Sequence, residues 1–327
     1  MAERTNALTK ARDAVWHPTS ASLRFLALLG VLGNAGIVAT GGAVRVTKSG
    51  LGCPEWPKCT GDSLTPTHSP DHGAVNMAIE FGNRMLTFLV LAVGVLVFVA
   101  AWRLRPRRRD LVWWAAAQPL SVVAQAVIGG IVVLTKLHPA SVSLHFLVSP
   151  ALLIFCVALW ARASEGDDRP RHLVAPYVRN LSRALVAAAA AVLIAGTVVT
   201  GTGPHAGDAD SRRYGFNIEN VARVHSGLAW ITVALTVVLL VTLIRTGAPT
   251  AARRRAVELV AIELAQGALG YIQYFMGVPA PLVVLHMLGA VLMWIAALRI
   301  LFALRDRGPV PATEPVPAQK HQAPQPA

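Results

Sequence analysis

Three histidines fall inside long apolar stretches of the sequence, where a polar ring is costly. They are His145 in "LHFLVS", His225 in "VHSGLAW" and His286 in "LHMLGA". An ionisable side chain within a membrane span marks a functional site by default. Two imidazoles facing each other between helices suit the two axial positions of a haem iron that transfers electrons. Hydrogen bonds between helices are the simpler alternative for such rings.

The second half of the sequence repeats the first. Gln125 and Gln266 each precede a histidine by about twenty residues, His145 and His286 respectively. The segment "AGIVATGG" in the first half also matches "AGTVVTGT" in the second. Parallel repeats of this kind predict two similar halves inserted in the same orientation.

The repeat is broken at one position. A shift of about 141 residues lays "AIEFGNRML" over "NVARVHSGL" and so places Asn83 opposite His225. Glu80 lies one helical turn before Asn83, on the same helix face. A carboxylate at this depth is costly unless it is paired or protonated. We interpret Glu80 as a carboxylate beside a reacting substrate; the alternative is an ion pair with Arg84, four residues on.

Three arginines lie near the outer ends of predicted spans: Arg45, Arg84 and Arg223. A guanidinium group binds carboxylates well, so these side chains are candidates to hold haem propionates. Ordinary snorkelling of a long side chain to the membrane interface is the alternative.

Cys53 and Cys59 bracket "CPEWPKC" in a predicted outer loop. Outside the membrane the milieu can be oxidising, so we expect a disulfide that closes this small loop. Zinc is disfavoured because one cysteine pair supplies too few ligands. The bond can be redox-active or a plain staple, and exposure and strain would decide between them. Cys156 is most simply a packing residue.

The composition predicts a membrane protein. Of 327 residues, 54% are hydrophobic and 14% charged, and long apolar stretches alternate with arginine-rich ones. A formal charge of +13 would suit a nucleic-acid-binding protein. The arginines, however, cluster between apolar spans, as expected for cytoplasmic loops, so nucleic acid is rejected as a partner.

The predicted fold is an all-α membrane protein of eight transmembrane helices, arranged as two pseudo-twofold-related four-helix bundles with both termini cytoplasmic. The predicted spans are 24–45, 75–102, 111–134, 140–162, 183–203, 219–244, 256–277 and 280–304. The predicted divisions are a cytoplasmic N-terminal segment (1–23), an N-terminal bundle (24–162), a cytoplasmic linker (163–182), a C-terminal bundle (183–304) and a disordered cytoplasmic tail (305–327).

The three intramembrane histidines lie at similar depths in these spans, about 8–9 Å below the outer surface at 1.5 Å per residue. The predicted haem sites therefore lie toward the extracytoplasmic side of the cell membrane. The other seven histidines fall in loops, tails or span edges, where we expect solvated side chains. They are His17, His68, His72, His138, His172, His205 and His321.

Five segments together resemble the haem A synthase family, over about residues 25–304: "TGGAVRVTKSGLGCPEWPKC", "IEFGNR", "LHFLVS", "VHSGLAW" and "LHMLGA". The arginine-flanked spans and the long C-terminal tail are consistent with an actinobacterial type. The resemblance implies a haem b cofactor held between His225 and His286. It also implies a substrate, haem O, bound by His145 with Glu80 as the catalytic carboxylate.

For the family, the chemistry is oxidation of one porphyrin methyl group to a formyl group. Two successive hydroxylations use oxygen from water and give a geminal diol, which loses water. Many members have histidine where this chain has Asn83, so Asn83 and Glu80 are expected to line the face opposite His145. The electron acceptor stays unnamed, and haem O synthase and a second copy of the chain are possible partners.

Two other functions would account for part of the sequence pattern. A membrane di-haem b-type cytochrome that only transfers electrons would explain the histidines but has no need of Glu80 or of the asymmetry at Asn83. A transporter built from parallel repeats would place polar residues midway through its spans. Here they lie near the outer ends.

Overall fold

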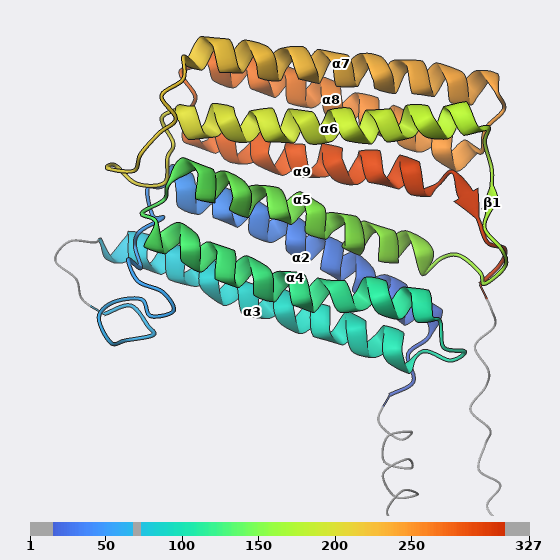
Figure 1. Ribbon diagram of the computed structural model, residues 1–327, viewed down its shortest axis with the longest axis horizontal. Helices are drawn as coiled ribbons and strands as arrows, with labels where there is room; N and C mark the ends of the chain where they lie inside the picture. The colour runs from blue at the N-terminus through green and yellow to red at the C-terminus, as the bar shows by residue number, and fades with distance from the viewer. Residues whose placement is uncertain (1–15, 68–72, 311–327) are drawn as a thin grey trace, which may run out of the picture.

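The computed structural model describes residues 16–67 and 73–310, which form eight long helices and one short strand pair (Figure 1). All eight predicted helices are therefore confirmed. The elements in chain order are α2 (Ser20–Val46), α3 (Ala74–Arg103), α4 (Arg109–Leu134), α5 (Pro139–Arg162), β1 (Arg171–His172), α6 (Pro176–Thr202), α7 (Ile218–Arg245), α8 (Thr250–Phe275), α9 (Ala280–Phe302) and β2 (Arg305–Asp306).

The helices form two groups of four that lie side by side (Figure 1). In the first group α2 packs on α3 and α5, and α4 packs on α3 and α5. In the second group α6 packs on α7 and α9, and α8 packs on α7 and α9. The groups meet where α9 contacts α2 and α5. There the Trp294 indole donates a hydrogen bond to the Pro150 carbonyl at 2.8 Å, and Gly42 leaves room for Met287.

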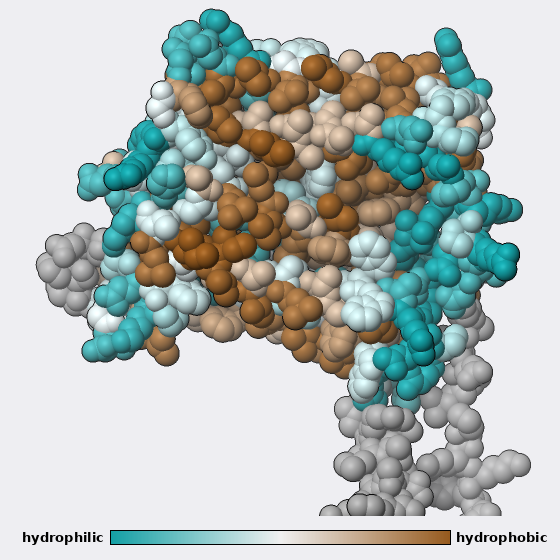
Figure 2. Space-filling view, viewed as in Figure 1, coloured by the Kyte–Doolittle hydropathy of each residue, from teal (hydrophilic) through white to brown (hydrophobic). Residues whose placement is uncertain are grey.

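Seven of the helices in the described residues are long and apolar enough to cross a membrane. The surface accordingly shows a hydrophobic band between two hydrophilic ends (Figure 2). The remaining helix, α8, has three consecutive arginines (253–255) in its first two turns and also carries Glu258 and Glu263. It lies against α7 and α9, and its apolar residues Ala252, Ala256 and Leu259 are buried at helical spacing.

The basic loops lie at one end of the helices. This end carries 103–109, 162–176, 245–250 and the β1–β2 pair, together with both ends of the described chain (Figure 1). The two long loops after α2 and α6 lie at the opposite end. The alternation expected from the sequence is thus present.

The predicted linker 163–182 is too long, because α6 begins at Pro176 rather than at residue 183. Proline at the first helical position has its φ already set for the helix. Val178, Ser182 and Leu185 follow at helical spacing and are buried, whereas Arg183 is exposed. The basic residues in these first turns concealed the helix, since they lie beyond the apolar part of the span.

The predicted disordered tail 305–327 is wrong for its first residues. Arg305 and Asp306 pair with β1, and the Gly166 amide donates to the Gly308 carbonyl at 2.9 Å. Arg305 also forms an ion pair with the largely buried Glu165 at 3.0 Å. These contacts with the 163–175 segment are tertiary, and the composition of the tail does not reveal them. The rest of the predicted tail, 311–327, lies outside the described residues.

Candidate functional site

Two of the intramembrane histidines face each other within the second group of helices. His225 of α7 and His286 of α9 have ring centroids 6.3 Å apart at an interplanar angle of 71°. Each ring lies against a helical glycine, Gly196 of α6 for His225 and Gly270 of α8 for His286. A Cβ at either glycine would be 3.3 Å from the Cε1 of the ring. A larger residue at either position would therefore require the ring to shift by a few tenths of an ångström.

The one ring hydrogen bond of this pair, made by His225, leaves the other nitrogen of that ring free for a ligand. His225 Nδ1 lies 3.2 Å from the Val192 carbonyl, a contact in which it is the donor. A donating Nδ1 leaves Nε2 with a lone pair, the arrangement found at metal-bound histidines. His286 Nδ1 is buried and has no hydrogen-bond partner within the described part of the chain. The Gln266 side chain holds the backbone of His286 through a 2.9 Å bond to its carbonyl.

A cavity of about 540 Å³ surrounds the pair and is lined mainly by α6, α7, α8 and α9, with further residues from α2 and α5. This volume lies within the usual range for cofactor sites. Imidazole nitrogens bind metals such as zinc at about 2.0–2.1 Å. With each ring centre about 1 Å beyond its bonding nitrogen, two rings on opposite sides of one ion have centroids about 6 Å apart. The observed centroid separation of 6.3 Å agrees with this spacing.

Two of the three predicted propionate-binding arginines line this cavity, Arg45 and Arg223. Arg45 belongs to α2 and so reaches across from the first group of helices. It donates hydrogen bonds to the carbonyls of Thr200, at 2.9 Å, and His205. Arg223 is more exposed and pairs with Glu219 at 3.4 Å.

The expectation of a solvated side chain is wrong for His205. Its Nε2 lies 2.8 Å from the Val278 carbonyl, and the ring lines the same cavity. The loop after α6 folds back over the end of α8, which the sequence does not reveal. Three of the other loop histidines are exposed, as predicted: His17, His138 and His172. The remaining three lie outside the described residues: His68, His72 and His321.

His145 has the same surroundings in the first group of helices as His286 has in the second. Its ring lies against Gly129 of α4, where a Cβ would be 3.3 Å from Cε1. The Gln125 side chain donates to the His145 carbonyl at 3.2 Å and to Ser149 at 2.7 Å. His145 Nδ1 is buried and without a hydrogen-bond partner among the described residues. The repeat seen in the sequence therefore extends to side-chain contacts.

Asn83 does not reproduce the surroundings of His225. Its Oδ1 accepts a hydrogen bond of 2.7 Å from the Thr40 hydroxyl of α2. Gly36, which aligns with Gly196 in the repeat, has no neighbouring atom within 4 Å of an added Cβ. The place that a fourth imidazole would take is thus open space.

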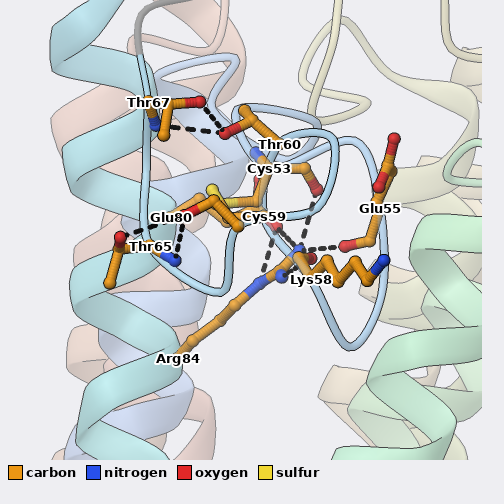
Figure 3. The surroundings of a disulfide bond; sticks show 10 residues. Cys53, Glu55, Lys58, Cys59, Thr60, Thr65, Thr67, Glu80 and Arg84 are labelled. Carbon is orange, nitrogen blue, oxygen red and sulfur yellow. Dashed lines mark hydrogen bonds and ion pairs between the residues drawn. A yellow bond between two sulfur atoms is a disulfide. The ribbon is translucent and has the colours of Figure 1, made fainter.

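Glu80 and Arg84 hold the cysteine loop (Figure 3). The predicted disulfide between Cys53 and Cys59 is present. Glu80 Oε2 accepts from the Cys53 amide at 2.7 Å, and Glu80 Oε1 pairs with Arg84 at 2.7 Å. Arg84 also donates to the carbonyls of Cys53, at 2.8 Å, and Lys58, at 2.9 Å. The ion pair between Glu80 and Arg84 that the sequence suggested is present. Together with these hydrogen bonds it fixes the cysteine loop to α3, and we call this set of contacts the Glu80 latch.

The same loop reaches α4 beside His145. A Cβ at Gly130 would lie 2.5 Å from the indole of Trp56, so the aromatic ring rests directly on this glycine. The preceding residue, Gly129, contacts His145. The loop thus connects the Glu80 helix with the helix that carries the His145 contact. Arg84 lies against the loop, whereas Arg45 and Arg223 lie at the cavity of the second group.

One carboxylate of the cavity was overlooked in the sequence. Glu263 of α8 is buried and lines the cavity of His225 and His286. The rule for intramembrane ionisable residues that identified Glu80 applies equally to Glu263, which lies within the predicted span 256–277. Its Oε1 lies 2.8 Å from the Thr236 hydroxyl.

We expect Arg84→Met to destabilise the protein by about 2–4 kcal/mol, because it leaves Glu80 unpaired in a site with little solvent. The loop carbonyls lose their donors as well. The measurement is the thermal unfolding midpoint in detergent. Arg223→Met is the matched control, since its pair with Glu219 is well exposed and should contribute less than about 1 kcal/mol. Equal midpoints for the two variants would contradict the latch.

Comparison with known proteins finds a matching family and several related sequences. A model of the COX15-CtaA family, described as cytochrome oxidase assembly protein, matches residues 24–298. The haem A synthase of Halalkalibacterium halodurans is 30% identical over 156 residues, which cover 47% of this chain and 50% of that protein. The haem A synthase of Alkalihalophilus pseudofirmus is 27% identical over 157 residues, which cover 48% of this chain and 50% of that protein. The match thus spans about half the length of these curated relatives.

The family match begins within α2 and ends within α9, so it includes both groups of helices and all three intramembrane histidines. Together with the seven apolar helices it makes this a multi-pass membrane protein. The chain belongs to the COX15-CtaA family of cytochrome oxidase assembly proteins.

Proposed function

We propose that this protein is a haem A synthase, an oxidoreductase that converts a methyl group of haem O to the formyl group of haem A. The methyl group and one water give an alcohol, two protons and two electrons. The alcohol and a second water give a geminal diol with the same release, and the diol loses water. Four electrons in total pass to an acceptor. The observation that carries the proposal is the family match across both groups of helices, in which named relatives are haem A synthases.

The C-terminal group is proposed to hold a resident haem b. His225 and His286 would hold the iron through their ring nitrogens, and Arg45 and Arg223 would pair with the propionates. When bound, such a group supplies one-electron transfer. Support comes from the ring spacing, the donating Nδ1 of His225 and the size of the cavity.

The N-terminal group is proposed to bind haem O through His145. Glu80 is the candidate catalytic carboxylate, which takes the proton of the attacking water in the usual role of a general base. Its orientation is set by the Cys53 amide and by Arg84. Asn83, held by Thr40, would line the face opposite His145 together with Glu80.

This assignment treats 24–162 and 183–304 as two functional units related by a pseudo-twofold axis along the membrane normal. The matched Gln125–His145 and Gln266–His286 contacts support the relation. Both histidine sites lie in the helix halves next to the long loops, which we place on the extracytoplasmic side. The basic loops and both termini would then face the cytoplasm.

Asn83→His is expected to create a second bis-histidine haem site. The new ring would enter the open space beside Gly36, which corresponds to the position of the His225 ring beside Gly196. After reconstitution with haem, the variant should retain about two haems per chain, each with a low-spin spectrum, and should release product more slowly. Met85→His, on the exposed side of the same helix, is the control. An unchanged ratio of haem to protein in Asn83→His would refute this reconstruction.

The decisive test is expression in a host that makes haem O but no haem A, followed by chromatography of the extracted haems. Appearance of haem A or its hydroxylated precursor supports the synthase. The second candidate is a membrane di-haem b-type cytochrome, which the facing pair of His225 and His286 would also serve. A purified protein that holds only haem b and forms no new haem species would favour the cytochrome.

A further inference from the structure

A carboxylate lies deep in the C-terminal cavity, where neither axial ligation nor propionate binding uses it. Glu263 is only 6% exposed and sits midway along α8. Its Oε1 is 2.8 Å from the Thr236 hydroxyl of α7, and its Oε2 is buried without a hydrogen-bond partner in the described chain. An ionisable group at such a depth carries a large cost, which function has to justify.

The polar pair is confined to the second half of the chain. With the shift that relates Gln266 to Gln125, Glu263 corresponds to Val122. With the shift that relates His225 to Asn83, Thr236 corresponds to Gly94. The first group of helices therefore has apolar residues at both positions. A role in packing the common fold would be met by apolar residues here too, so the pair points to a property of the second site alone.

Thr236 can satisfy Glu263 in either protonation state. Its hydroxyl oxygen lies 2.8 Å from Glu263 Oε1 and 3.0 Å from the Thr232 carbonyl. A hydroxyl has one proton to donate and can also accept. Toward a carboxylate, Thr236 donates to Oε1. Toward a carboxylic acid, it turns its proton to the Thr232 carbonyl and accepts the proton carried on Oε1. Rotation of one O–H bond therefore lets the site accommodate either protonation state of Glu263.

We propose that Glu263 is the proton-binding group coupled to reduction of the haem b in the C-terminal bundle. One electron from a one-electron donor enters the cofactor, and one proton from water binds the Glu263 carboxylate at Oε1. When the electron leaves, the proton leaves too. The physical reason is charge balance, since two charges inside a protein interact more strongly than they do in water. This inference rests on the proposed function, because it requires haem b between His225 and His286.

The other charged groups around α8 are less suited to this role. The histidines of α7 and α9 would be occupied as ligands. On α7, Arg223 pairs with Glu219 at the outer end, and on α9, Arg299 pairs with Glu258 at the opposite end. The titratable side chains of α6 lie in its first turns, and those nearer the cavity opening are Arg45, His205, Tyr271 and Tyr274.

The test is a spectroelectrochemical titration of the haem b in the purified full-length protein at a series of pH values. The wild-type midpoint potential should fall with rising pH, toward the limit for one proton per electron, where a tenfold change in proton concentration converts to about 59 mV. Glu263→Gln, of equal size, should lose this dependence. Glu258→Gln, on the same helix, is the control and should keep it. Thr236→Val should keep the pH dependence of the potential but shift the pH range in which it occurs upward. The reason is that the Glu263 carboxylate loses the hydroxyl that donates a hydrogen bond to it.

The outcomes separate the two proposals. If the wild-type protein binds no haem with a bis-histidine spectrum, the proposed function of this bundle fails first. If haem binds normally and Glu263→Gln titrates like the wild type, the coupling is wrong. A measurement that needs no variant is the infrared difference between reduced and oxidised wild-type protein. It should show the carbonyl band of a protonated carboxylic acid on reduction, and absence of that band would overturn the proposal.

Discussion

Replacement of His286 by alanine is expected to reduce the haem b content of the purified protein roughly tenfold or more. Loss even of an indirect partner of a metal-bound histidine costs about 10–100-fold in affinity, and His286 would be a direct ligand. No neighbouring side chain is expected to take over this role, because the position of the ring over Gly270 is set by the backbones of α8 and α9. His225→Ala should have the same effect, since the two rings face each other.

The measurement is the haem-to-protein ratio together with the spectrum of the reduced protein. His172→Ala is the matched control, because His172 is exposed in β1 at the other end of the helices. It should retain its haem. Wild-type haem content in both His225→Ala and His286→Ala would remove the basis for a bis-histidine site in the C-terminal bundle.

Glu80→Gln should lower the rate of haem A formation by about 10²–10⁴-fold, the usual contribution of a general base. The amide keeps a carbonyl oxygen that can accept from the Cys53 amide, so the loop latch is largely preserved. The haem b spectrum should not change, because Glu80 lies in the other group of helices. The loss should appear in the rate of conversion, with haem O binding through His145 little affected.

Glu80→Ala separates the two roles of this side chain. It removes both the carboxylate and the hydrogen bond to the loop, so it should lower the thermal midpoint as well as the rate. Glu55→Gln is the control, since Glu55 is an exposed carboxylate of the same loop. If Glu80→Gln is as active as wild type, Glu80 is a structural latch for the disulfide loop and the catalytic carboxylate must be sought elsewhere.

Much of the fold was predictable because membrane helices are local structures. About twenty apolar residues in a row are enough to specify a span, and seven of the eight helices in the described residues have this composition. The predicted boundaries were wrong where charged residues belong to an ordered helix or segment outside the apolar part of a span. The first turns of α6 and α8 carry arginines yet continue their helices, and residues 305–310 are ordered by ion pairs with a segment more than a hundred residues away.

The candidate site was likewise predictable only in part. The repeat predicted that His225 and His286 lie at equal depth in one bundle, and the structure places their rings face to edge. It did not show that Arg45 of the first half reaches the cavity of the second, or that His205 joins it. Nor did it show that Glu80 holds the Cys53 amide.

By itself the sequence indicated which segments are apolar enough to span a membrane, predicted similar depths for the three histidines, and showed that the two halves differ at Asn83. These follow from hydropathy and from helical rise, which are properties of short segments. Only the tertiary structure decided which of these residues meet. The rings on their glycines, the Glu80 latch and the Glu263–Thr236 pair depend on how helices approach and where loops return. Those distances are set by packing between segments far apart in the chain, which no local pattern encodes.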